Sequence, residues 1–308
     1  MSIANGQAEN NQEASGISGK PENRLAAEER MLIIGALGQL GKALKSEYPG
    51  ATAVDREDFD ITDSKFVANY DWSKVDIILN AAAYTNVDGA ETAEGRKLAW
   101  QINATGVGHL AKAAAQNDIA LVHISSEYVF DGHQTAHDED EPFSPLGVYA
   151  QSKAAGDIAA AVAEKHYILR TSWLIGDGPN FVRTMIGLAA KDVSPTVVND
   201  QIGRLTFTPT LVGAISHLLS VDAPFGTYNV SNDGEPASWA DVTRLILKEL
   251  GRDDLKVTGT TTAEYFAQKD GAAPRPLHSS FNLDKIRSTG FVMSDWREEL
   301  SKYIKEEA

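Results

Sequence analysis

One short segment, from Met31 to Gly41, restricts the fold more than any other part of the chain. Four apolar residues, Met31-Leu32-Ile33-Ile34, predict a buried strand, and Gly35, Gly38 and Gly41 follow directly before a helical segment. Glycines in such a turn permit a pyrophosphate to approach the backbone N–H groups at the helix N-terminus. The spacing is G-x-x-G-x-x-G, and a glycine triplet alone is more often an ordinary turn. Strand, glycine turn and helix in this order predict a dinucleotide-binding loop.

An acid follows at the distance that such a loop requires. The next predicted strand, Ala51 to Val54, ends at Asp55, twenty residues after Gly35, where an acid binds the ribose hydroxyls of the adenosine. Asp55 favours NADH because a carboxylate repels a 2′-phosphate, whereas Arg56 favours NADPH because it can pair with that phosphate. We therefore expect both cofactors to be used. Asp60-Ile61 lies within reach of an adenine edge, and its alternative role is a helix cap.

An alternation of strands and helices continues from the glycine loop to residue 124. A third predicted strand, Val75 to Leu79, ends in the stretch Asn80 to Asp88, whose small residues at 81–83 let a dinucleotide lie against the backbone. A helix is predicted from Leu98 to Ala115, and the Asn103 amide within it is expected to brace neighbouring backbone. The alternation implies an α/β chain of Rossmann type with a doubly wound parallel sheet.

Ser126, Tyr149 and Lys153 form the candidate catalytic group. The apolar run Leu121 to Ile124 predicts a buried strand, so Ser126 is expected just past its carboxyl end, where open α/β sheets bind ligands. The alanine-rich segment Tyr149 to Val162 predicts a helix with Tyr149 and Lys153 on one face. This arrangement suits proton transfer to a carbonyl oxygen during hydride transfer. Tyr149 would donate the proton, Lys153 would lower the pKa of Tyr149, and Ser126 would hold the substrate oxygen. The alternative is an ordinary helix surface with a half-buried tyrosine and a solvated lysine.

Composition and charge exclude several classes of protein. The 308 residues carry a formal net charge of -15 with a pI near 4.9, and 43% of them are hydrophobic, which is ample for a core. Binding to nucleic acid or to an anionic membrane needs a basic surface, so neither partner is expected. The chain has no cysteine, which excludes disulfides and thiolate chemistry. No stretch is apolar for long enough to cross a bilayer, and we expect a cytoplasmic protein.

The chain is expected to divide into three parts. Residues 1–30 are polar and lack the apolar core of a signal peptide, so we interpret them as a flexible extension or a linker from an upstream domain. Residues 31–172 are expected to form the dinucleotide-binding domain, and residues 173–308 mostly a smaller substrate-binding cap. Helices are predicted near 180–190 and at 238–250, and a return to the sheet is expected near 227–231.

Two features outside the predicted sheet bear on ligands. Pro274-Arg275-Pro276 predicts a rigid turn that presents one guanidinium, and Arg275 could either clamp a nucleotide diphosphate or form a surface ion pair. His133 and His137 lie four residues apart beside aspartates, a spacing that can bind a metal in a helix. In a glycine- and acid-rich loop we expect solvated histidines instead, and no metal site.

With these stretches in hand, residues 31–305 resemble the extended short-chain dehydrogenase/reductases and, within them, the family of dTDP-4-dehydrorhamnose reductases. The broad features are the glycine loop with Ser126, Tyr149 and Lys153. The narrower ones are four stretches of sequence: Asn80 to Asp88, Ser126 to Gly132, Arg170 to Trp173, and Asp200 to Gly203.

The resemblance implies roles for residues that the patterns alone leave open. The resemblance places nine residues along an NADPH or NADH site: Gly38, Gln39, Leu40, Asp55, Asp60, Ile61, Ala83, Tyr84 and Thr85. Ser126, Glu127 and Trp173 would face a dTDP-sugar. The implied reaction is reduction of the 4-keto group of a dTDP-6-deoxy-sugar. A homodimer and a fused or associated sugar epimerase are the protein partners considered.

The chain departs from the family pattern at three places. Ser126-Glu127 replaces threonine-aspartate, Leu205 replaces a proline, and Ala150 replaces a glycine after the tyrosine. None of these changes removes a catalytic group.

Two other functions stay open from the sequence. A nucleotide-sugar dehydratase or epimerase shares the same three catalytic residues, although a dehydratase usually has an acid where this chain has Tyr128. A non-catalytic regulatory subunit could keep the fold as a binding module. The intact Ser126, Tyr149 and Lys153 favour an enzyme.

Overall fold

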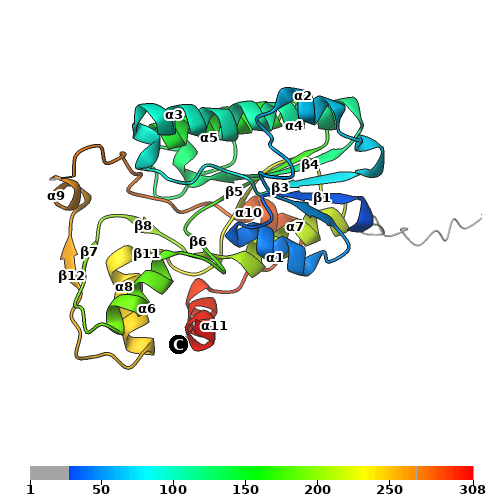
Figure 1. Cartoon of the computed structure of the whole chain (residues 1–308). Coiled ribbons are helices and arrows are strands. Elements are labelled where there is room, and N and C mark those ends of the chain that lie inside the picture. Colours follow the sequence, from blue (N-terminus) through cyan, green and yellow to red (C-terminus); the bar gives the residue numbers. More distant parts are fainter. Residues whose placement is uncertain (1–27, 268, 308) are drawn as a thin grey trace, which may run out of the picture.

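A computed structural model, which describes residues 28–267 and 269–307, shows a central sheet between two layers of helices, with a second lobe beside it (Figure 1). The sheet has six parallel strands in the order β10-β5-β4-β3-β1-β2. Their bounds are β1 Met31–Ile34, β2 Thr52–Val54, β3 Ile77–Asn80, β4 Ala120–Ser126, β5 His166–Thr171 and β10 Gly226–Val230. The chain winds outward from the centre in both directions, so the switch point lies between β1 and β3, where such sheets bind ligands.

Helices cover both faces of this sheet (Figure 1). One face carries α2 Ser64–Asn69, α3 Ala93–Trp100, the π-helical turn η4 Gln101–Gly106, α4 Val107–Gln116 and α5 Val148–Ala160. The other face carries α1 Gln39–Glu47, α7 Thr208–Ser220 and α10 Asp284–Ser288. Successive residues of β1 alternate between the two layers: Met31 and Ile33 pack in the core with α1 and α7, and Leu32 and Ile34 in the core with α2 and α4. A strand buried on both sides explains why its sequence is wholly apolar.

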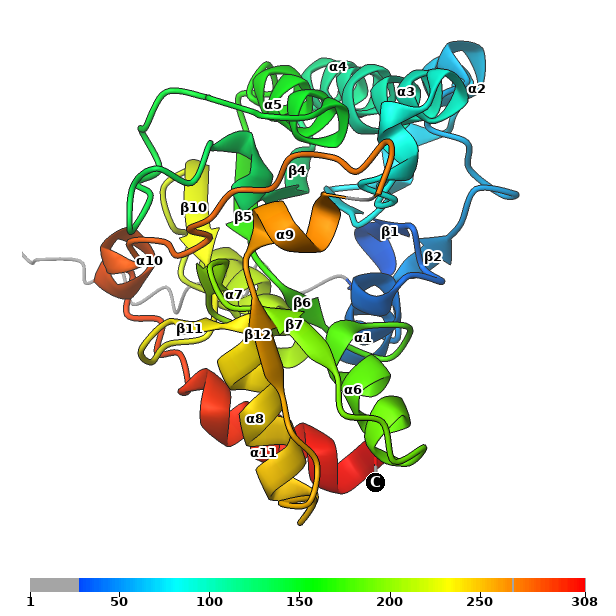
Figure 2. The same ribbon diagram turned by 90° about the vertical axis from the view of Figure 1, so that its left-hand side faces the viewer.

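The second lobe has its own apolar core. Figure 2 shows α6, α8 and α11 gathered at its lower end, and the core contains Val182, Ile246, Trp296 and Leu300. Its helices are α6 Phe181–Ala189, α8 Trp239–Glu249, α9 Thr262–Phe266 and α11 Trp296–Glu307. Its short strands are β6 Leu174–Ile175, β7 Thr196–Val198, β8 Ile202–Gly203, β9 Thr206–Phe207, β11 Ala237–Ser238 and β12 Thr258–Thr260.

Short 3-10 turns complete the described elements: η1 Glu28–Arg30, η2 Trp72–Lys74, η3 Gly89–Glu91 and η5 Glu127–Val129. The first of them, η1, lies at the end of the predicted extension, residues 1–30. Arg30 pairs with Asp76 at 2.6 Å, and Glu28 accepts a hydrogen bond from the Gly50 backbone N–H. The rest of the predicted extension, residues 1–27, lies outside the described residues.

The structure confirms most of the predicted elements and lengthens one. Strand β10 and helices α6 and α8 confirm the elements predicted at 227–231, 180–190 and 238–250. The helix predicted from Leu98 to Ala115 begins earlier, at Ala93, and contains the π-helical turn η4. Helix α7, in the second half of the chain, packs beneath the sheet against α1, so residues after 173 contribute to both lobes. The division at residue 172 therefore stays a proposal. Within the described residues, no helix is both long enough and apolar enough to span a membrane.

Candidate active site

The glycine loop leaves its helix end open toward a ligand. Gly35 has a φ of +85°, and a Cβ there would lie 2.7 Å from the Ala82 backbone nitrogen, so no other residue fits without strain. A Cβ on Gly41 would overlap the Gly35 carbonyl oxygen, which holds loop and helix close together. Gly38 precedes α1 as its N-cap and offers no side chain, so the first N–H groups of the helix have no side-chain cap. This arrangement suits a pyrophosphate.

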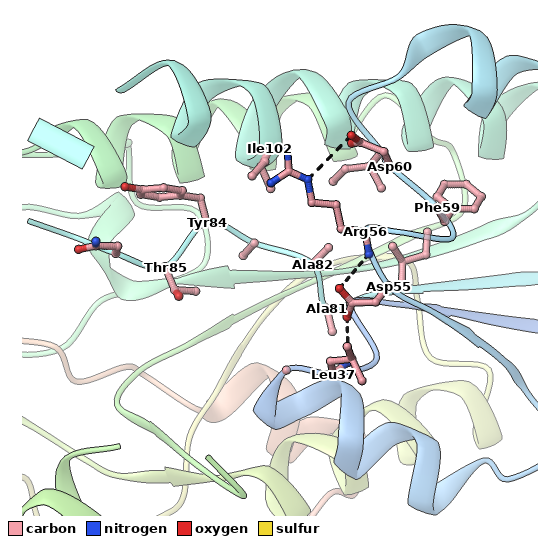
Figure 3. Close-up of a pocket in the computed structure, with 16 residues that line it drawn as sticks. Leu37, Asp55, Arg56, Phe59, Asp60, Ala81, Ala82, Tyr84, Thr85 and Ile102 are labelled. Carbon is pink, nitrogen blue, oxygen red and sulfur yellow. Dashed lines mark hydrogen bonds and ion pairs between the residues drawn. The ribbon is translucent and has the colours of Figure 1, made fainter. Parts of the chain in front are cut away.

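A first cavity continues from this loop to the predicted adenosine residues (Figure 3). The Asp55 carboxylate lies at its wall and accepts hydrogen bonds from the backbone N–H groups of Leu37 at 2.9 Å and Arg56 at 2.8 Å. Arg56 extends past Asp55 toward Asp60, with its Nε 4.0 Å from the Asp60 carboxylate (Figure 3). The Arg56 side chain is 69% exposed, so water screens this pair and leaves the guanidinium free to move. Ile61 is buried beside Gly106 in the same wall.

The loop after β3 forms the middle of the cleft, and Asn103 fixes it. Asn103 accepts a hydrogen bond from the Tyr84 N–H at 2.8 Å and donates to the Tyr84 carbonyl oxygen at 3.0 Å. It also donates to the Ser152 hydroxyl on α5 at 3.0 Å. This confirms the bracing role predicted for its amide. Ala83 and Thr85, on either side of the clamped residue, line both cavities of the cleft.

A second cavity brings together the predicted catalytic residues. Ser126, Tyr149 and Lys153 all line it, together with Gly38, Gln39 and Leu40 from the glycine loop. The Ser126 hydroxyl donates to the Glu127 carboxylate at 2.7 Å, and the Lys153 ammonium donates to the Ile124 carbonyl oxygen at 2.7 Å. The Tyr149 ring stands edge-on against Tyr128, with the ring centroids 5.4 Å apart. The alternative of a solvated helix surface is wrong, because Lys153 is only 2% exposed.

Burial controls the protonation of this cavity. Burial raises the pKa of Glu127 to about 7, although hydrogen bonds with Ser126 and Ser279 oppose the shift. Burial also lowers the pKa of Lys153 to about 8, against the opposing effect of the Asp157 carboxylate. The pKa of Tyr149 is raised by burial and then by the nearby Glu127 charge. Desolvation dominates in this structure, so the pKa of Tyr149 is raised overall, and a lowering of that pKa by Lys153 stays a prediction.

Asp157 is a residue near the site that the sequence reasoning missed. It lies four residues after Lys153 on α5, is buried, and pairs with the buried Arg170 at 2.9 Å. Its spacing continues the series of Tyr149 and Lys153 at every fourth residue, and this is the signal that could have identified it.

The wall on the side of the second lobe is formed by Trp173. Its φ of +46° is unusual for a residue with a side chain, and its indole stacks on Trp239 with centroids 3.6 Å apart. A Cβ on Gly203 would lie 2.8 Å from this indole, so the stretch that ends in Gly203 packs closely against Trp173. Two distant stretches that carried the family resemblance thus meet at one wall of the cavity.

Arg275 and the two loop histidines, His133 and His137, each have partners within the protein. Arg275 forms a two-point ion pair with Asp88, at 2.8 and 2.9 Å, and does not line the second cavity. The ion pair is thus present, and the role of Arg275 as a clamp on a nucleotide diphosphate stays a prediction. His133 is exposed, but the expectation of a solvated His137 is wrong: it is buried, stacks on Phe130 and contacts Glu141 at 2.8 Å. Among the described residues, no cluster of three or more His, Cys, Asp or Glu side chains is placed to hold a metal.

Comparisons with known proteins agree with this geometry. Residues 29–308 match the family described as RmlD substrate binding domain. A dTDP-4-dehydrorhamnose reductase of Mycolicibacterium smegmatis is 35% identical over 290 residues, covering 90% of this chain and 85% of that protein. One of Aggregatibacter actinomycetemcomitans is 36% identical over 293 residues, covering 88% and 97%.

A solved structure supports the same assignment. The crystal structure of a dTDP-4-dehydrorhamnose reductase from Bacillus anthracis in complex with NADP has a TM-score of 0.83 and 36% identity, covering 90% of this chain and 99% of that one. The predicted Rossmann-type fold and the resemblance to this reductase family are confirmed. The chain belongs to the family of the RmlD substrate binding domain.

Proposed function

We propose that this chain is an NAD(P)H-dependent oxidoreductase that reduces the 4-keto group of a dTDP-6-deoxy-sugar, converting dTDP-4-dehydro-L-rhamnose to dTDP-L-rhamnose. One observation carries the proposal: Ser126, Tyr149 and Lys153 line the same cavity as the glycine loop. The names of the relatives, and the NADP in the related crystal structure, support the choice of substrate and cofactor.

The dinucleotide fits the residues of the cleft. The glycine loop provides close backbone approach and an uncapped helix end for the pyrophosphate, and Asp55 and Arg56 stand where the adenosine ribose would lie. A bound NADPH or NADH supplies the hydride. Because Asp55 suits the ribose hydroxyls of NADH and the mobile Arg56 suits the 2′-phosphate of NADPH, both cofactors are expected to work.

The chain's own residues hold the proton and transfer it to the substrate. The raised pKa of Tyr149 keeps its phenol protonated, which is the state a general acid needs for reduction. The Ser126 hydroxyl holds the keto oxygen, and Lys153 places a buried positive charge one helical turn from the phenol. Tyr149 transfers its proton to the oxygen as the alkoxide forms. Glu127 and Trp173, which both line this cavity, would contact the sugar.

The experiment is an assay of NADPH and NADH oxidation with dTDP-4-dehydro-L-rhamnose, with the product identified by mass spectrometry. A gain of two hydrogens supports the reductase. Isomerisation of the sugar without cofactor consumption would indicate an epimerase. Binding of NADPH without any turnover would indicate a regulatory subunit.

We further propose a compartment and two protein partners for this chain. The chain is expected to act in the cytoplasm, to form a homodimer, and to work with a sugar epimerase joined to it or associated with it. Light scattering of the purified chain, alone and with the epimerase, would measure both assemblies.

A further inference from the structure

The loop between β6 and α6 touches the dinucleotide loop directly. This loop, residues 176–180, follows strand β6, whose first residue, Leu174, lines the second cavity next to Trp173. The Gly176 N–H donates to the Gln39 side-chain oxygen at 3.0 Å. Gln39 is the first residue of α1, immediately after Gly38. One side chain therefore joins the cofactor loop to the second lobe.

The Gln39 side chain packs closely against the backbone of Gly176 and Gly178. A Cβ on Gly178 would lie 3.0 Å from the Gln39 Cγ, and a Cβ on Gly176 would lie 3.3 Å from the Gln39 Cβ. Two glycines thus leave room for this one side chain. The resemblance assigned Gln39 to the cofactor, but its side-chain oxygen is engaged by the second lobe.

Hydrogen bonds from Asn180 and Tyr303 also fix the loop at residues 176–180. Asn180 donates to the carbonyl oxygens of Gly176 at 2.9 Å and Gly178 at 3.1 Å, and to the Tyr303 hydroxyl at 2.8 Å. Tyr303 in turn donates to the Gly176 carbonyl oxygen at 3.0 Å. The loop is thus bonded to α11 through Tyr303 and connects directly to β6, which begins next to Trp173.

We propose that Gln39 is a positioning residue that links binding of the dinucleotide to the placement of Trp173 in the wall of the substrate cavity. A pyrophosphate that binds at the open end of α1 orders the first turn of that helix, and Gln39 carries the ordering across to Gly176. The second part of the inference, tighter binding of the sugar nucleotide when the cofactor is present, rests on the proposed function.

Hydrogen–deuterium exchange of the full chain tests the link with NADP⁺ alone. Saturating NADP⁺ should slow exchange in peptides covering both 35–41 and 174–180 of the wild type. In Gln39→Leu, which keeps the volume and loses the acceptor, NADP⁺ should still protect 35–41 but no longer protect 174–180. Equal protection of 174–180 in the variant, or none in the wild type, would overturn the proposal.

Two further variants separate the link from a simple cofactor contact. Gln39→Glu keeps an acceptor for the Gly176 N–H but adds a charge near the pyrophosphate, so it should weaken NADP⁺ binding and still protect 174–180 at saturation. Lys42→Ala removes the other contact between the same segments, an exposed ion pair with Asp177 at 2.9 Å, and should behave as the wild type. Loss of the protection in Lys42→Ala, or in Gln39→Glu, would contradict the specific role of Gln39.

Calorimetry then measures the consequence for the sugar site. NADP⁺ should tighten binding of dTDP-L-rhamnose at least about fivefold in the wild type and less than about twofold in Gln39→Leu, since couplings between sites typically fall in the range of about 5 to 150-fold. Equal tightening in both proteins would contradict the inference and leave the proposed function intact. If the wild type does not bind dTDP-L-rhamnose at all, the proposed function fails, and the exchange measurement still decides the link.

Discussion

The two ends of the cleft differ in how they use charge. At the catalytic end, Glu127 and Lys153 are buried and Tyr149 is partly buried, and desolvation shifts the pKa of each. At the adenosine end, Arg56 is largely exposed and its contact with Asp60 is long. Electrostatic effects are strong where water is excluded and weak where it screens. Single substitutions should therefore have large effects at the catalytic end and small ones at the adenosine end.

The largest effect is expected for Tyr149→Phe. This change removes the proton donor and little binding surface, so kcat should fall by about 10² to 10⁴-fold, the usual range for general acid catalysis. Affinity for NADPH should stay within a few-fold. Steady-state kinetics and cofactor titration of the purified variant measure the two quantities, and turnover close to that of the wild type would contradict the assigned role.

Glu127→Gln should remove a pH dependence of stability. The folded pKa of Glu127 is raised to about 7 from a reference of 4.5, so between these values the folded state holds a proton that the unfolded state has released. This contribution to stability is complete at low pH and is lost as pH rises toward and through 7. The loss between pH 5 and pH 8 is about 2 kcal/mol for such a shift.

Denaturant unfolding of wild type and Glu127→Gln at pH 5 and pH 8 measures this difference. The variant should lose about 2 kcal/mol less stability than the wild type over that interval. Parallel losses in the two proteins would show that Glu127 ionises as an exposed glutamate does.

Asp157→Asn should shift the pH profile of the reaction. The Lys153 ammonium, with a pKa of about 8, loses its charge as pH rises, so kcat/KM should decline above about pH 8. Removal of the Asp157 carboxylate lowers the pKa of Lys153 further, and the decline should begin at lower pH. Because Asp157 also pairs with Arg170, circular dichroism must first establish that the variant is folded. An unchanged alkaline limit in a folded variant would exclude this role.

The smallest effects are expected at the adenosine end. NADH and NADPH should differ in kcat/KM by no more than about tenfold, or about 1.4 kcal/mol. Arg56→Ala should weaken use of NADPH and spare NADH, whereas Asp55→Ala should weaken NADH. Kinetics of both variants with both cofactors decide the point. A fall of equal size for the two cofactors in Arg56→Ala would mean that Arg56 does not contact the 2′-phosphate.

Features of the fold and of the site that depend on local geometry could be predicted from the sequence. The glycine loop and the pair Tyr149 and Lys153 are local patterns, because a turn and an i, i+4 spacing fix their geometry without knowledge of the rest of the chain. Strand β1 was equally clear, since burial on both faces makes it wholly apolar. Strand β5, which carries His166 and Arg170, was not predicted.

What the sequence could not provide depends on distant contacts. Arg275 pairs with Asp88, 187 residues away, and no local pattern predicts that partner. The direction of the Tyr149 pKa shift depends first on burial and then on the Glu127 charge, and burial is a property of the whole fold. The second lobe draws its core from separated segments, including Val182, Ile246 and Leu300, so its boundaries could not be derived from one continuous stretch.

The central claim is that the buried end of the cleft reduces the keto group of a sugar nucleotide. The most direct measurement is a single turnover of dTDP-4-dehydro-L-rhamnose with NADPH that carries deuterium on the transferred position, followed by NMR of the sugar product. We expect one deuterium at C4 of the sugar with the wild type, and almost none over the same time with Tyr149→Phe. Deuterium at another carbon, or equal labelling by the two proteins, would contradict it.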